Sequence, residues 1–145
     1  MRLVADSNVL FTHFWKSSVF MDIVNQDVTL YSPEYALEEI EKHRQEIIKK
    51  TGLDRVEFNV LRKNLELKIS FINEREYAQS FKPALESIEN LPKPQQTELC
   101  EDLDFIALSI KMRCPLWSND KLLKKQTTVT VLNTHELLLL MGEKY

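Results

Sequence analysis

The chain contains 145 residues, of which 43% are hydrophobic and 28% are charged, a composition typical of a soluble globular protein. This length suits one hydrophobic core, so we expect a single domain over residues 1–145. The formal net charge of −3 argues against a protein that holds nucleic acid by bulk positive charge alone.

Membrane and secretory segments are not expected in this sequence. No stretch approaches the roughly 18 consecutive apolar residues of a membrane-spanning helix. Asp6 interrupts the apolar start of the chain and no small-residue cleavage site follows, so we expect no signal peptide. Cys100 and Cys114 lack the C-x-x-C spacing of zinc and redox motifs, which favours two reduced thiols. These features predict a cytoplasmic protein.

Short apolar strands alternate with longer helical segments in the first half of the chain. The expected strands are residues 2–6, 28–32 and 68–72, and the expected helices are residues 7–15, 17–26, 34–50, 54–65 and 74–91. Pro33 is suited to begin a helix, and Gly52 ends it before a second helix, which predicts a helical hairpin. Pro83 should kink or split the 74–91 helix.

The second half continues the alternation. We expect, in order, a loop at 91–96, a helix at 101–113, a strand at 115–117, a turn at 118–120, a short helix at 121–125, a strand at 129–133 and a helix at 135–143. Strands that are short and continuously apolar are buried on both faces. The pattern predicts a three-layer α/β/α fold with a central, mainly parallel sheet of about five strands.

Two aspartates are expected at one edge of this sheet. Asp6 ends the first strand, and Asp120 follows the 115–117 strand by three residues. In parallel α/β sheets, sites lie beyond the carboxyl ends of the strands. Each aspartate also has a structural explanation, because Asp6 can cap the following helix and the sequence around Asp120 is ordinary turn chemistry. Their shared edge favours a common site.

The helix after Pro33 offers neighbouring glutamates. Ala36, Ile40 and Ile47 define its apolar stripe. At 100° per residue, Glu39 lies about 100° from the centre of the stripe and Glu38 about 160° away. Glu39 can therefore reach into a cleft beside the core, whereas Glu38 should face water.

Three carboxylates occupy four positions at the start of the 101–113 helix. The apolar stripe of this helix is formed by Leu103, Ile106, Ala107 and Ile110. Asp102 lies about 90° from the stripe, and Asp104 lies about 110° away on the other flank, where Lys111 could neutralise it. Glu101 lies almost opposite and should be exposed. Helical geometry prefers Asp102 clearly over Glu101 and only modestly over Asp104.

At this point the sequence resembles the PIN domain family, named after the PilT N-terminus. This family comprises metal-dependent ribonucleases and includes the toxins of bacterial and archaeal toxin–antitoxin pairs. The segment "LVADSNVLF" is similar to the opening strand of the family, with its first acidic residue at Asp6. The segment "SPEYALEEIEKH" is similar to its acidic helix, and the spacing of six from Pro33, with Ile40 following, places the family glutamate at Glu39.

The most specific similarity lies in "EDLDFIALSIKMRCPLWSNDKLL". The family aspartate precedes an Ala-Leu-small segment by five residues, which selects Asp102 ahead of Ala107. The following strand runs into a Ser/Thr-x-Asp sequence, here Ser118 to Asp120. The resemblance therefore implies one PIN-like nuclease domain across nearly the whole chain.

This resemblance implies an endoribonuclease that hydrolyses RNA phosphodiester bonds with Mg²⁺ or Mn²⁺. The implied metal ligands and catalytic residues are Asp6, Glu39, Asp102 and Asp120, with Asp104 and Glu38 as alternatives one register away. The residues implied to orient ligands or phosphate are Ser7, Ser118 and Asn119, and Lys121 could contact the RNA backbone. Four carboxylates brought together raise one another's pKa values or require cations, which agrees with a metal site.

Partners and competing functions follow from the same resemblance. The helical hairpin at residues 33–66 resembles an arm that packs against a second copy or an antitoxin, so we expect a homodimer and a possible antitoxin partner. One alternative is a structure-specific DNA nuclease, and another is a non-catalytic PIN interaction module. An aspartyl-phosphate domain built on Asp6 is disfavoured, because the acidic residue needed two positions later is replaced by Asn8.

Overall fold

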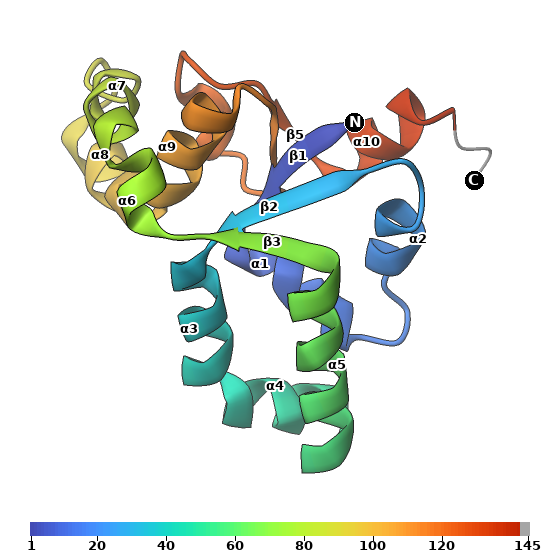
Figure 1. Ribbon diagram of the computed structural model, residues 1–145. Helices are drawn as coiled ribbons and strands as arrows, with labels where there is room; N and C mark the ends of the chain where they lie inside the picture. Colours follow the sequence, from blue (N-terminus) through green and yellow to red (C-terminus); the bar gives the residue numbers. More distant parts are fainter. Residues whose placement is uncertain (143–145) are drawn as a thin grey trace.

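The computed structural model describes residues 1–142 and has a five-stranded sheet at its centre (Figure 1). The strands are β1 (Arg2–Ala5), β2 (Thr29–Pro33), β3 (Ile69–Ile72), β4 (Leu116–Trp117) and β5 (Val131–Leu132). They follow the order β3-β2-β1-β4-β5, and every neighbouring pair is parallel. The predicted three-layer fold is confirmed, with a wholly parallel sheet.

Helices cover the sheet on both faces. The α-helices are α1 (Ser7–Phe11), α2 (Phe20–Val24), α3 (Glu34–Lys42), α4 (Arg44–Thr51), α5 (Arg55–Lys68), α6 (Glu74–Tyr77), α7 (Phe81–Glu86), α8 (Lys93–Leu99), α9 (Leu103–Met112) and α10 (Thr134–Leu140). Short 3-10 turns are η1 (Thr12–Phe14), η2 (Ala78–Ser80), η3 (Cys100–Asp102) and η4 (Leu123–Lys125). Helices α3, α4 and α5 extend from one side of the sheet, and α6 to α9 gather on the other (Figure 1). Among the described residues, no helix is long and apolar enough to cross a bilayer.

The carboxyl ends of β1 and β4 coincide, and this alignment positions the site. Ala5 pairs with Trp117, and the N–H of Asp6 donates to the Trp117 carbonyl at 3.2 Å. Ala5 is completely buried and Trp117 is 1% exposed, because the central strands are covered on both faces. Asp6 and Ser118 are thus the first residues beyond the same edge.

The predicted helix over residues 34–50 is wrong in one respect, because it is broken at His43. This residue has φ −99° and ψ 12°, so α3 ends before it and α4 begins after it. Arg44 holds the corner through a 2.8 Å ion pair with Glu41 and a position 4.6 Å above the Phe58 ring. Gly52 ends α4 in the left-handed region at φ 75°, as predicted.

Three further predictions of helix boundaries need correction. The 91–96 segment is not all loop, because α8 begins at Lys93 with Pro94 in its first turn, where no backbone N–H is needed. The 101–113 helix begins only at Leu103, after the 3-10 turn η3. The 74–91 helix is split at η2, and Pro83 lies in the first turn of α7. The predicted end of the last helix at residue 143 lies outside the described residues.

Candidate active site

Asp6 is the cap of α1 and lies directly beyond the carboxyl end of β1. Its side chain is 4% exposed and caps α1 by accepting the N–H of Val9 at 2.9 Å. The N–H of Asn8 also donates to this carboxyl group. Burial raises the pKa of Asp6, the hydrogen bonds from Ser118 and Val9 oppose that rise, and the nearby charge of Asp120 adds to it. Asp6 is therefore a buried carboxyl group beside a second acidic residue.

Ser118 connects Asp6 to Asp120. The Ser118 hydroxyl is completely buried, hydrogen-bonds to Asp6 and accepts the Asp120 N–H at 3.0 Å. Asp120 is half-buried, and its Oδ1 accepts the N–H of Leu122 at 2.9 Å. One hydroxyl thus fixes the carboxyl end of β4 relative to that of β1, as expected for two parallel strands ending together.

The next two predicted residues lie at the rim of this edge. Asn119 is exposed, and its Oδ1 accepts the N–H of Thr134 at 2.9 Å, which ties the loop to the start of α10. Asn119 therefore holds the loop through α10. Lys121 is exposed and follows Asp120 directly in the sequence.

Asp102 lies at the junction of η3 and α9. Its φ of −106° and ψ of 8° place it outside the α-helix, and its side chain makes no capping hydrogen bond. Burial, followed by the charges of Asp6 and Asp120, raises the pKa of Asp102 to about 7. The structure therefore places Asp102 close enough to Asp6 and Asp120 for their charges to interact, although the three come from separate segments.

Asp104 has a different environment from Asp102. It accepts a hydrogen bond of 2.6 Å from the hydroxyl of Tyr77, a residue that is 1% exposed. Burial and this bond to Asp104 raise the pKa of Tyr77. The predicted neutralisation by Lys111 is therefore wrong, because Tyr77 of α6 is the partner of Asp104. Glu101 is exposed, as predicted.

Glu39 is a partly buried residue of α3. Its side chain is 21% exposed, and one of its oxygens lies 3.5 Å from Nε2 of His43. Burial, a hydrogen bond to Glu39 and the charges of Glu39 and Asp102 all raise the pKa of Tyr35. Tyr35, itself a residue of α3, is thus near both Glu39 and Asp102, whereas Glu38 is exposed. Sequence reasoning missed Tyr35, although it lies one helical turn before Glu39.

The acidic residues fit a divalent cation chemically but do not form a finished metal site. Among residues 1–142, no three His, Cys, Asp or Glu side chains already converge around a common point. The neighbouring carboxylates raise one another's pKa values, and a cation would offset that repulsion. The buried hydroxyl of Ser7, beside Asp6 in the sequence, has no hydrogen-bond partner. It could accept a hydrogen bond from a metal-bound water.

The chain is similar to a known protein family over most of its length. A family model described as PIN domain matches residues 4–139, which is most of the chain. A search of curated proteins found no match.

Proposed function

Because the chain belongs to the PIN domain family, whose members are generally metal-dependent nucleases, we propose that it is an endoribonuclease that hydrolyses RNA phosphodiester bonds. One observation carries the proposal. Asp6, Asp102 and Asp120 come from three segments and lie near one edge of a parallel sheet, close enough for their charges to act on one another. A structural role alone would not require three carboxylates to share a partly buried edge.

The proposed metal ligands are Asp6, Asp102 and Asp120, with Glu39 from α3. Bound Mg²⁺ or Mn²⁺ would supply an activated water and stabilise negative charge on the leaving oxygen. Ser118 holds Asp6 and Asp120 in position, and Tyr35 holds Glu39.

The structure favours one member of each ambiguous pair. We prefer Asp102 to Asp104, because Asp104 is engaged by Tyr77 while Asp102 is affected by Asp6 and Asp120. We prefer Glu39 to Glu38 because only Glu39 turns toward Tyr35 and His43. Membership of a toxin–antitoxin pair, a homodimeric state and a cytoplasmic location stay predictions from sequence.

The decisive experiment compares Asp102→Asn with Glu101→Gln, a matched change at the exposed neighbouring position. Asp102→Asn should lower Mg²⁺- or Mn²⁺-dependent cleavage of single-stranded RNA by at least about a hundredfold, while its circular dichroism spectrum stays unchanged. Glu101→Gln should cleave normally. Full cleavage by a purified Asp102→Asn protein would remove Asp102 from the mechanism.

Substrate class requires a parallel assay. Matched single-stranded RNA and branched DNA are incubated with the wild-type protein under the same metal conditions. Preferential cleavage of RNA supports the proposal, and preferential cleavage of branched DNA would replace it with a structure-specific DNA nuclease. A titration without binding at millimolar Mg²⁺ or Mn²⁺ would favour the non-catalytic module.

A further inference from the structure

A hollow of about 330 Å³ lies beside the acidic edge, between the α1 region and α4. Its lining includes Asn8, Phe11 and Trp15 from one side and His43, Glu46 and Lys50 from the other. This volume is at the lower end for small-ligand pockets and suits one nucleoside rather than a folded partner. No role proposed above uses this hollow.

Both walls of the hollow contact proposed metal ligands. The backbone N–H of Asn8 donates to Asp6, while the side chain of Asn8 lines the hollow and is exposed. On the other wall, Nε2 of His43 lies 3.5 Å from Glu39. A group bound in the hollow would therefore be an immediate neighbour of a phosphodiester bound at the acidic edge.

The lining combines an aromatic surface with hydrogen-bonding and charged groups. Trp15 is 37% exposed, so part of its indole is accessible to a bound group. The ring of His43 packs edge-on against Phe11, with centroids 5.8 Å apart, so its position is fixed. Nζ of Lys50 lies 2.7 Å from Glu46, which places a cation and an acceptor at the rim.

We propose that this hollow is a nucleobase subsite for single-stranded RNA, in which a base next to the scissile phosphodiester stacks on Trp15. The amide of Asn8 would hydrogen-bond to the base edge, and Lys50 would lie near the backbone phosphate. Only an unpaired base exposes its face to an aromatic side chain. Stacking also suits a chain with a net charge of −3, which cannot depend on bulk positive charge.

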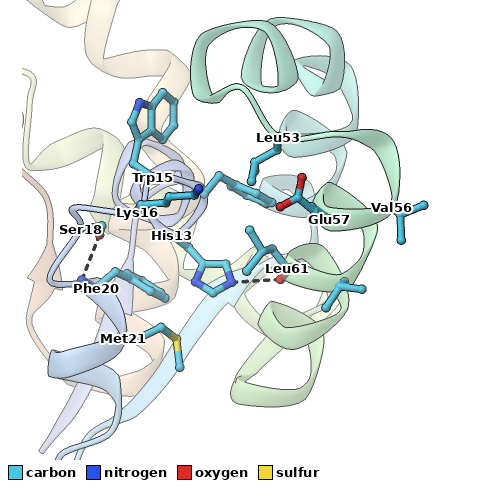
Figure 2. A pocket seen from close by; sticks show the side chains of 12 residues that line it. His13, Trp15, Lys16, Ser18, Phe20, Met21, Leu53, Val56, Glu57 and Leu61 are labelled. Carbon is cyan, nitrogen blue, oxygen red and sulfur yellow. Dashed lines mark hydrogen bonds between the residues drawn. The ribbon is translucent and has the colours of Figure 1, made fainter.

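This inference rests on the proposed function, since it assigns the substrate of the same site. It must also be separated from a larger apolar pocket of about 520 Å³ that Trp15 shares. Figure 2 shows that pocket, with the indole of Trp15 on the far side from His13 and Met21. Val60 lines the larger pocket and not the hollow, so Val60→Ala is the matched control.

Tryptophan fluorescence can test the subsite directly. The chain has two tryptophans, of which only Trp15 lines the hollow, while Trp117 is 1% exposed and stacked on Phe20. A short single-stranded oligoadenylate should quench the fluorescence of the full-length Asp102→Asn protein, which is used to limit cleavage. An abasic oligomer of equal length should not. Trp15→Phe should abolish this quenching.

Affinity is measured separately with end-labelled oligoadenylate by fluorescence anisotropy. Trp15→Ala should weaken binding about tenfold, Trp15→Phe should restore most of it, and Asn8→Ala should weaken it less than Trp15→Ala. Val60→Ala should bind like the parent protein. In the active background, Trp15→Ala should raise the KM for RNA with little change in kcat.

Each contrary result has a defined meaning. Any of four results would overturn the subsite. These are absence of RNA binding, binding without quenching, equal quenching by the abasic oligomer, and an equal loss of affinity in Val60→Ala and Trp15→Ala. If Asp6→Asn abolishes cleavage while Trp15→Ala leaves KM unchanged, the ribonuclease proposal stands and the subsite fails. Trp15-dependent binding to a wild-type protein that never cleaves RNA would reject the ribonuclease and retain the subsite.

Discussion

The acidic edge and the apolar pocket around His13 both bury titratable side chains and disfavour their charged forms, but the surroundings of these side chains differ. At the acidic edge, Asp6 and Asp102 have raised pKa values because burial and neighbouring carboxylates disfavour their charge. In the apolar pocket, burial lowers the pKa of His13, while Nε2 of this ring hydrogen-bonds to the Leu61 carbonyl at 3.0 Å (Figure 2). Aromatic rings of Phe14 and Phe20 complete its surroundings.

The difference separates a stabilising region from one that opposes folding. A neutral His13 with a backbone partner is compatible with its apolar neighbours. Ionised Asp6 and Asp102 near each other cost free energy unless protons or cations are present. The acidic edge therefore carries a cost in folding free energy, which the apolar side of the fold must offset and which the proposed metal binding would reduce.

The largest expected effect tests the stabilising region. Phe58 is completely buried and stacks on Phe14 with ring centroids 4.8 Å apart, so Phe58→Ala should lower the free energy of unfolding by about 3–5 kcal/mol. Val60→Ala, at a position 56% exposed on the same helix, should change it far less. Urea denaturation measures both. Similar losses for the two variants would contradict the proposed core.

The effect of Asp102→Asn on the free energy of unfolding should have the opposite sign. Without metal and above pH 7, it should raise the free energy of unfolding by about 1–2 kcal/mol, since water screening reduces the cost of this partly exposed carboxylate. The folded pKa lies above the unfolded one, so the cost of the charge grows as pH rises from about 4 to about 7 and the gain should vanish at the acid end.

Thermal melts in EDTA across this pH range check the prediction, with Glu101→Gln as the exposed control. Saturating Mg²⁺ or Mn²⁺ should stabilise the wild-type protein and so reduce the difference in melting temperature between it and Asp102→Asn. A destabilised Asp102→Asn protein at high pH would show that Asp102 makes a favourable contact that the structure does not reveal.

A smaller effect concerns His13. Its folded pKa is below the unfolded value, so the wild-type protein should lose about 1 kcal/mol of stability as pH falls from about 7 to about 5, because the unfolded chain takes up the proton first. His13→Gln should lack this loss, as seen by comparing the slopes of urea-derived stability against pH. An equal slope in His13→Gln would contradict it, and His135→Gln at an exposed site serves as the control.

A change of similar size is expected for Tyr77→Phe, which removes the donor to Asp104. We expect a loss of about 1 kcal/mol in stability and nearly unchanged cleavage, because Asp104 is not a proposed ligand. A strong loss of cleavage in Tyr77→Phe alone would favour Asp104 over Asp102 as a ligand.

Tyr35→Phe, which frees Glu39, should lower kcat with little loss of stability.

The fold could be predicted largely because its strands are short, apolar and separated by helices. The shared edge of Asp6 and Asp120 followed from parallel strands. The helical phase that favours Asp102 holds only for a continuous helix, and Asp102 precedes α9; the family spacing to Ala107 selects the same residue independently. Three features could not be predicted, because each depends on contacts between distant segments. They are the hydrogen bond from Tyr77 to Asp104, the two hydrogen bonds that Ser118 makes with Asp6 and Asp120, and the position of Tyr35.

The break at His43 has a consequence for how substrate preference can change. A straight helix over residues 34–50 would be about 25 Å long and would carry Lys50 away from α1. The corner instead returns Lys50 to the hollow that Asn8 and Trp15 line. A relative with a straight helix here would keep every proposed metal ligand but would lack Lys50 in the proposed base subsite. Substrate preference could therefore change through one backbone position while the cleavage chemistry stays the same.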